Sequence, residues 1–104
     1  MQQIPLMAKP AQTLKVVLAG QNCQIYVYQK AQGVFVDVNA NGVDVSVATL
    51  AHDAVPLVPR DYAGFLGNLM FIDTKGASDP QYSGMGTRYA LVYLTADEYA
   101  LIRK

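Results

Sequence analysis

Apolar and polar residues alternate along most of the first fifty positions, which is the pattern of strands that bury one face. In segments 12–18 and 23–30 the apolar residues fall on one face, at Leu14, Val16, Leu18, Cys23, Ile25 and Val27. Gly20-Gln21 between them suits a two-residue turn with glycine first. We therefore predict a hairpin in which Leu18 lies opposite Cys23 and the apolar residues of both strands share one face.

The Asn41-Gly42 dipeptide is the strongest short hairpin signal in the chain, and it follows segment 34–39, whose three valines share one face. A four-residue loop would set Asp37 opposite Asp44, and two like charges there would be destabilising. A two-residue turn instead pairs Val38 with Val45 and Val36 with Val47, and it sets Asp37 opposite the neutral Ser46. With a further turn at Gln32-Gly33, the result is a four-stranded antiparallel meander.

The second half of the chain holds two more apolar runs, 68–73 and 89–94, which are rich in strand-forming residues. The loop between them, 74–88, is punctuated by Gly76, Pro80, Gly84 and Gly86. Loops of this length are uncommon in a small domain and tend to be functional or disordered. We predict that the two strands pair and hold the loop toward a partner. The preceding segment 49–61 contains two prolines and gives at best a short edge strand.

The N-terminal segment 1–10 carries two prolines, which favour an extended arm over a helix. Its apolar residues Ile4 and Leu6 have no strand partner in the predicted meander. We expect both side chains to dock on a neighbouring subunit or along the edge of a β-barrel.

The C-terminal segment 95–104 changes character. Thr95 and Glu98 have the spacing of a capping box, and the first turn that follows is acidic. Arg103 and Lys104 stand near the other end, as the helix macrodipole prefers. We predict a short helix over residues 96–102.

About six short strands and one small helix predict a small all-β domain, and a length of 104 residues suits a single domain over 1–104. A closed or nearly closed antiparallel β-barrel would remove the edges that so apolar a sheet exposes. A two-sheet sandwich is the alternative.

Charged residues make up only 15% of the chain, and the formal net charge is zero. A surface poor in charge at zero net charge favours association, and it gives no support for a nucleic-acid or membrane partner. The first ten residues do not have the pattern of a signal peptide, and no apolar run approaches the length of a membrane span. We expect a soluble subunit of an assembly that folds in a reducing cytoplasm.

Residues capable of catalysis are few and form no recognisable set. His52 is the only histidine and stands beside Asp53 in the irregular segment, where we interpret it as a surface histidine next to an acid. Cys23 is the only cysteine and lies on the apolar face of a predicted strand, where a free cysteine behaves as a small hydrophobe. We therefore predict no enzymatic activity.

Ligand sites are also poorly supported. Asp73, Ser78 and Asp79 could be imagined around a calcium ion, but their spacing matches no EF-hand and the carboxylates are too few. Gly84-Met85-Gly86 lacks the lysine and the helix of a phosphate loop. The 7 tyrosines could stack bases, but no basic stripe accompanies them. We expect no metal ion and no cofactor.

Short motifs distributed along the chain carry a family resemblance through their order and spacing. The first half contributes Ile4-Pro5-Leu6, Leu18-Ala19-Gly20-Gln21 and Pro56-Leu57. The second half contributes Tyr62…Gly64-Phe65…Gly67…Leu69 and Asp73…Gly76…Asp79-Pro80-Gln81-Tyr82…Gly84-Met85-Gly86…Arg88-Tyr89…Leu91…Tyr93-Leu94. With these motifs the chain resembles the small baseplate plug proteins of contractile-tailed phages and prophages, of the cyanophage type.

The resemblance implies a structural protein of the virion, a small β domain in the central tail baseplate. Its partners would be other baseplate, hub and tail-tube proteins, with several copies in a symmetric assembly that forms in the host cytoplasm. The resemblance brings no catalytic motif with it. A small-ligand-binding β-barrel is the alternative function.

The large side chains of the long loop are the strongest candidates for contact with a partner. Tyr and Arg are frequent at interface hot spots, and Met adapts to irregular surfaces. Together with the N-terminal arm, the predicted interface comprises Ile4, Leu6, Tyr82, Met85 and Arg88. The alternative is that Tyr82 and Met85 fold back onto the core of the domain itself.

Overall fold

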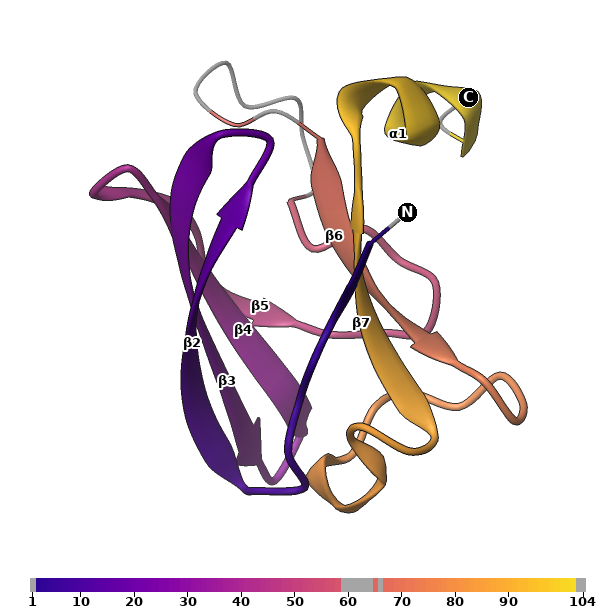
Figure 1. Ribbon diagram of the computed structural model, residues 1–104. Coiled ribbons are helices and arrows are strands. Elements are labelled where there is room, and N and C mark those ends of the chain that lie inside the picture. The colour runs from indigo at the N-terminus through magenta and orange to yellow at the C-terminus, as the bar shows by residue number, and fades with distance from the viewer. Residues whose placement is uncertain (1, 59–64, 66, 103–104) are drawn as a thin grey trace.

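The computed structural model describes residues 2–58, 65 and 67–102, and in this part of the chain two antiparallel sheets face each other (Figure 1). The first sheet has the strand order β2-β3-β4-β5 and consists of β2 (Ala11–Leu18), β3 (Gln21–Lys30), β4 (Gly33–Ala40) and β5 (Val43–Leu50). The second has the order β1-β7-β6 and consists of β1 (Gln2–Ile4), β6 (Asn68–Asp73) and β7 (Tyr89–Leu94). The predicted four-stranded meander and the pairing of segments 68–73 and 89–94 are confirmed.

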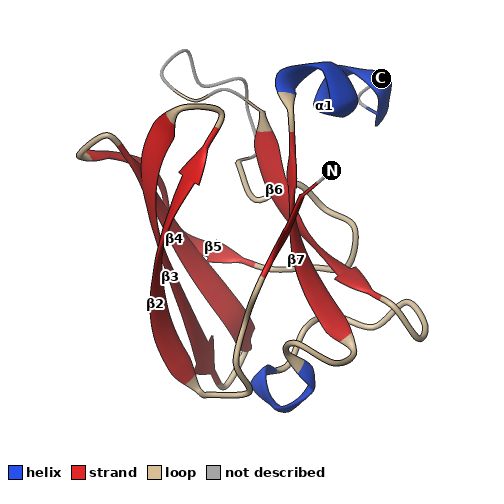
Figure 2. Ribbon diagram, viewed as in Figure 1, coloured by secondary structure: helices blue, strands red, loops and turns tan. Residues whose placement is uncertain are grey.

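The predicted barrel is wrong, and its alternative, the two-sheet sandwich, is correct. In the described residues the segment after β5 adds no strand. Its ladder contacts with the second sheet are isolated bridges, Asp53 to Phe71 and Pro56 to Met70. A proline cannot donate a hydrogen bond to a strand ladder. The segment after β5 therefore does not connect the two sheets into a closed barrel. Figure 2 shows the strands gathered on two sides of the molecule, with the two helical pieces at opposite ends.

The core lies between the sheets and is built from the inward face of each strand. Every second residue is buried in β3 as far as Val27 and along the whole of β4, as the alternation predicts. The second sheet contributes larger side chains. The fully buried positions include Leu18, Ile25, Val27, Val34, Val36, Val38, Leu57, Leu69, Phe71 and Leu91. The hydrophobic pattern therefore identifies the inward faces of β2, β3 and β4 correctly.

The first hairpin has a different turn from the predicted one. The turn residues are Ala19 and Gly20, with φ of 51° and 76°, and Leu18 pairs with Gln21. Gln21 is therefore part of β3, where it is buried and donates from Nε2 to the Leu18 carbonyl at 3.0 Å. The register is shifted by two residues, so Val16 faces Cys23. Because side chains alternate with a period of two, the apolar face survives this shift.

The Asn41-Gly42 turn is confirmed, but the predicted register beyond it is wrong. Ala40 pairs with Val43 as expected, and register shifts on either side of Val38 then set it opposite Ser46. The predicted partner of Val36, Val47, is 60% exposed instead of buried.

Side-chain hydrogen bonds explain this irregularity of β5. The Asp37 carboxylate accepts from the N–H of Ala48 at 2.6 Å, and Ala48 has a φ of 53°. Ser46 turns inward and donates from Oγ to the Leu57 carbonyl at 3.2 Å. Local bonds of this kind compete with the regular ladder and produce bulges.

The N-terminal arm forms part of the fold itself. Gln2–Ile4 adds β1 to the edge of β7, with Ile4 opposite Leu91, so Ile4 has the strand partner that the sequence did not reveal. The Ile4 side chain is 3% exposed and belongs to the core, and Leu6 packs against it in a partly buried position. Of the two predicted positions for the arm, it occupies the one along a sheet edge.

The helix α1 (Ala96–Ile102) has the predicted bounds and the predicted capping box. The Thr95 N–H donates to Glu98 Oε1 at 2.9 Å, and the Glu98 N–H donates to Thr95 Oγ1 at 3.2 Å. Tyr99 packs on the outer face of the second sheet. Residues 59–64, Arg103 and Lys104, which also entered the predictions, lie outside the described part. Within that part no helix is long and apolar enough to cross a membrane.

Candidate functional site

The loop 74–88 is closed at its base by an ion pair between Asp73, at the end of β6, and Arg88, just before β7. Arg88 Nε and Nη2 donate to the two carboxylate oxygens of Asp73, both at 2.8 Å. The N–H groups of Lys75 and Ser78 donate to the same carboxylate at 3.0 and 2.8 Å. We call these four residues the loop clamp. Bidentate arginine–carboxylate pairs fix geometry as well as charge.

The electrostatics of the loop clamp follow from burial and pairing. The Asp73 side chain is fully buried, whereas that of Arg88 is 38% exposed. Hydrogen bonds from Arg88 hold the pKa of the Asp73 carboxyl far below its usual range, although burial acts in the opposite direction. The hydrogen bonds to Asp73 in turn raise the pKa of Arg88. Both oxygens of Asp73 are engaged by the chain, so the carboxylate is not arranged as a calcium ligand.

The lowered pKa of Asp73 predicts how stability depends on pH. A carboxyl whose folded pKa lies below its unfolded value stabilises the fold fully above the unfolded pKa, and this contribution is lost as the pH falls toward the folded pKa. We therefore expect the melting temperature to decline below about pH 4, the ordinary range of aspartate. Thermal melts between neutral and acid pH check this. An Asp73→Asn variant with the same acid dependence as the parent would contradict it.

A second attachment joins the loop to the segment after β5. Asp79 accepts from the Asp53 N–H at 3.1 Å, and its other oxygen lies 3.0 Å from His52 Nδ1. The hydrogen bond with His52 lowers the pKa of Asp79. The predicted surface histidine next to an acid is confirmed, since the His52 side chain is 48% exposed, but its partner is Asp79 and not the adjacent Asp53. Asp53 instead accepts from the Asp73 N–H at 2.7 Å.

The far end of the loop is anchored on the core. Met85 is 2% exposed and belongs to the main hydrophobic cluster, and Gln12 Nε2 from β2 lies 3.7 Å from its sulfur. The next residue, Gly86, has a φ of 83° and passes so close to the Leu6 carbonyl that a Cβ would stand 2.5 Å from that oxygen. Only glycine combines this φ with such an approach.

Tyr82 lies between these attachments and begins a single turn of 3₁₀ helix, η1 (Tyr82–Gly84). Its N–H donates to Gln29 Oε1, at the end of β3, at 3.1 Å. The turn closes through a bond from the Met85 N–H to the Tyr82 carbonyl, also at 3.1 Å. The Tyr82 side chain remains 38% exposed. The loop is therefore held by both sheets, and Tyr82 is its exposed large hydrophobic residue.

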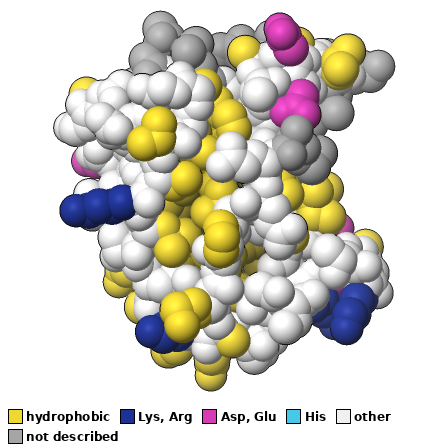
Figure 3. Space-filling model, in the orientation of Figure 1, with side chains coloured by type: hydrophobic (Ala, Val, Ile, Leu, Met, Phe, Trp, Pro, Cys, Tyr) yellow, Lys and Arg dark blue, Asp and Glu magenta, His cyan; other side chains and the backbone are white. Residues whose placement is uncertain are grey.

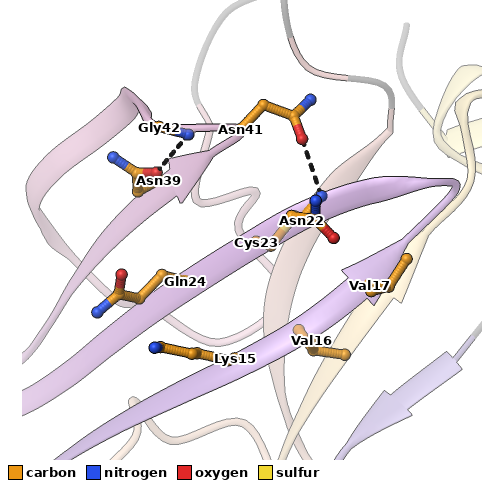
Figure 4. Close-up of a pocket in the computed structure, with 9 residues that line it drawn as sticks. All are labelled: Lys15, Val16, Val17, Asn22, Cys23, Gln24, Asn39, Asn41 and Gly42. Carbon is orange, nitrogen blue, oxygen red and sulfur yellow. Dashed lines mark hydrogen bonds between the residues drawn. The ribbon is translucent and has the colours of Figure 1, made fainter.

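A second surface feature is a shallow open pocket on the outer face of the first sheet (Figure 4). Figure 4 shows the side chains of Lys15, Gln24 and Asn39 side by side across β2, β3 and β4. Asn41 Oδ1 accepts from the Asn22 N–H at 3.0 Å and closes one end. The lining is rich in carboxamides, and its charged member is Lys15. Such a surface can bind polar groups but holds no pair of catalytic residues.

An aromatic row continues along the same outer face. The rings of Tyr26 and Tyr28 stack at 4.6 Å, and Tyr28 stacks on Phe35 at 5.9 Å. The Lys30 ammonium lies 5.4 Å from the Tyr28 ring centre. The Tyr28 hydroxyl donates to Asp37 at 3.1 Å, and burial followed by this bond raises the pKa of Tyr28. The stacked rings connect β3 to β4 on this face, and Tyr26 remains 39% exposed.

The structure places the five predicted interface residues in different environments. Ile4 and Met85 are buried in the core, and Leu6 is partly buried against it. For Met85 the alternative reading, folding back onto the core, describes its position. Arg88 is engaged in the loop clamp, and Tyr82 remains exposed. Tyr82, Met85 and Arg88 all belong to the loop 74–88. Their contact with a partner stays a prediction.

The remaining candidates for chemistry are not brought together. Cys23 is buried and free, and burial raises the pKa of its thiol, which disfavours the reactive thiolate. His52 lies at the surface beside Asp79. Among the described residues no group of three or more His, Cys, Asp or Glu side chains is arranged to hold a metal ion.

Two features of the site were missed at the level of sequence. The pairing of Asp73 with Arg88 had a visible signal, because opposite charges stand at the ends of two strands that were predicted to pair. The contact of Gln29 with the Tyr82 N–H joins residues 53 positions apart and left no such signal.

Comparison with models of known protein families identifies a match. The family model described as cyanophage baseplate Pam3 plug gp18 matches residues 1–97. No curated protein matches the chain. The matched range runs from the N-terminal arm through the loop 74–88 and into the first turn of α1. The chain therefore belongs to the cyanophage baseplate plug family, a structural component of the virion tail baseplate that associates with other baseplate proteins.

Proposed function

We propose that this chain contacts tail-tube and hub proteins of the baseplate through the loop 74–88, with Tyr82 as its main contact residue. The observation that carries this proposal is the state of Tyr82: its backbone is fixed on either side while its ring stays exposed. Tyrosine is enriched at interface cores because it combines a large apolar area with a polar tip.

The construction of the loop supports a role in binding. Ordering a mobile loop at an interface costs free energy, and a loop that is already held in place avoids much of that cost. Here the loop clamp holds the base, Asp79 holds one side and Met85 holds the other. Packing of the core alone does not explain why an exposed loop is held by so many attachments.

The other predicted interface residues take different roles in this proposal. Met85 and Arg88 position the loop, and Ile4 and Leu6 tie the N-terminal arm to the second sheet. Tyr82 makes the contact. The assembly itself would contain several copies in a symmetric arrangement that forms in the host cytoplasm, since closed symmetry is the usual solution for repeated subunits.

Tyr82→Ala should leave the fold intact and prevent incorporation into the baseplate. Its ring is 38% exposed, so little core packing is lost. Truncation of a hot-spot residue typically costs about 2 kcal/mol or more of binding. The measurements are the melting temperature of the isolated protein and its abundance in purified particles. Tyr26→Ala is the matched control, because Tyr26 is 39% exposed on the outer face of the first sheet.

Two results would contradict the proposal. A steep loss of stability in Tyr82→Ala would mean that the ring serves the protein's own core. Normal particles with Tyr82→Ala but defective ones with Tyr26→Ala would move the contact surface to the outer face of the first sheet.

A further inference from the structure

The two sheets of the sandwich are open along β2. Among the residues that the structure describes, this strand is an edge of the first sheet, and its eight residues pair on one side only, with β3. Its inward residues Leu14 and Val16 are only partly buried, whereas their partners Ile25 and Cys23 are 0% and 3% exposed. Figure 3 shows hydrophobic side chains gathered in a column between β2 and β7. Part of the core is thus exposed beside the edge of β2 that faces away from β3.

The backbone of this edge is available for pairing. In a hairpin with a two-residue turn, the flanking pair, here Leu18 and Gln21, exchanges both of its hydrogen bonds. Alternate residues then direct their N–H and C=O groups away from β3, and in β2 these are Ala11, Thr13, Lys15 and Val17. An edge strand of this kind is a ready template for another strand.

The positive charge of Lys15 at the β2 edge favours an acidic partner over a basic one. The first thirty residues contain Lys9, Lys15 and Lys30 and no aspartate or glutamate. Lys15 lies at the centre of the β2 edge and is the charged residue that lines the adjoining pocket. An acidic side chain on an added strand would pair with Lys15, whereas a basic one directly opposite would be destabilising.

Copies of this same chain are poor partners for the edge. Two β2 strands in antiparallel pairing would bring their central lysines close together. The other edge of the sheet, β5, is irregular, because register shifts interrupt its ladder and Asp37 binds the Ala48 N–H. Bulges of this kind protect an edge from pairing.

We propose that β2 binds an extended segment of a different protein as an added strand. The segment would alternate apolar and polar residues, cover Leu14 and Val16 with its apolar row, and carry an acidic residue in its polar row beside Lys15. Backbone hydrogen bonds supply affinity in this mode, and alternate side chains supply specificity. This surface is separate from the loop 74–88, and the proposal does not depend on the role of Tyr82.

The test uses the full chain and two labelled nine-residue peptides that alternate threonine and valine, one with a central glutamate and one with a central lysine. We expect the glutamate peptide to bind more tightly, by fluorescence anisotropy. Thr13→Pro removes an edge N–H without touching the ladder to β3 and should weaken binding about tenfold, the effect of roughly one hydrogen bond. Thr13→Val keeps the N–H and is the matched control.

Reversing the charge at Lys15 is the second part of the test. Lys15→Glu should invert the preference between the two peptides, and Tyr82→Ala should bind the glutamate peptide with parental affinity. The proposal is overturned if neither peptide binds, or if Thr13→Pro and Thr13→Val bind equally well. It is also overturned if the parent self-associates in size-exclusion chromatography and Thr13→Pro abolishes this, because a second copy would then occupy the edge.

Discussion

Replacing Val38 with aspartate should abolish stable folding, whereas the same replacement at Val47 should be tolerated. Val38 is 1% exposed at the centre of the core, and Val47 is 60% exposed on the irregular part of β5. A charge buried without a partner is among the few changes that cost more than about 4 kcal/mol, and small domains have only about 5–15 kcal/mol in total.

Thermal melts followed by circular dichroism distinguish the two variants. They also decide between two registers, because the sequence pattern alone places Val47 inside and opposite Val36. Unfolding of Val47→Asp would contradict the observed register and favour the regular one. A parental melting temperature for Val38→Asp would contradict the burial of Val38, which both registers share.

The second large effect is expected at the loop clamp. Asp73→Asn would place an amide NH2 group where a carboxylate oxygen now accepts hydrogen bonds from Arg88 and Ser78. It would also leave Arg88 without its charge partner. Removing one member of a buried, hydrogen-bonded ion pair is strongly destabilising. We expect the melting temperature to fall by about 10 °C or more. Asp44→Asn, at an exposed aspartate of β5, is the control and should change little.

A double-mutant cycle gives the sharper test of the same pair. Arg88→Met alone leaves the Asp73 carboxylate buried and uncompensated, whereas the combination with Asp73→Asn removes both charges. The loss in the double variant should therefore be smaller than the sum of the two single losses. Simple additivity would show that the two side chains act independently.

The position of the loop also links stability to assembly. The loop clamp lies at the base of the segment that carries Tyr82, so damage at Asp73 should disturb both the fold and incorporation into the particle. Tyr82→Ala should disturb incorporation only. This difference separates residues that shape the loop from Tyr82, the residue that we propose makes the contact.

Much of this protein follows from its sequence alone. Alternation identified the inward faces of β2, β3 and β4, because side chains of a strand point to opposite sides with a period of two. The bounds of 68–73 and 89–94 followed from runs of strand-forming residues, and those of α1 from a capping box. The order and spacing of short motifs indicated the baseplate plug family, which the family match confirms.

Other features were decided by contacts between distant residues. The first turn moved to Ala19-Gly20 because Gln21 is held in the strand, and β5 became irregular because Asp37 and Ser46 bind backbone groups across the fold. Alternation contains no information on such bonds, since a shift of two residues preserves the apolar face.

The sequence by itself thus determined the inward faces of β2, β3 and β4, the bounds of β6, β7 and α1, and the family to which the chain belongs. Only the tertiary structure decided that the sheets form an open sandwich, that Ile4 and Met85 are buried, and that Asp73 and Arg88 close the long loop. The physical reason is the range of the forces. Periodicity and capping act between near neighbours in the chain, whereas burial, ion pairing and sheet edges depend on which distant segments meet.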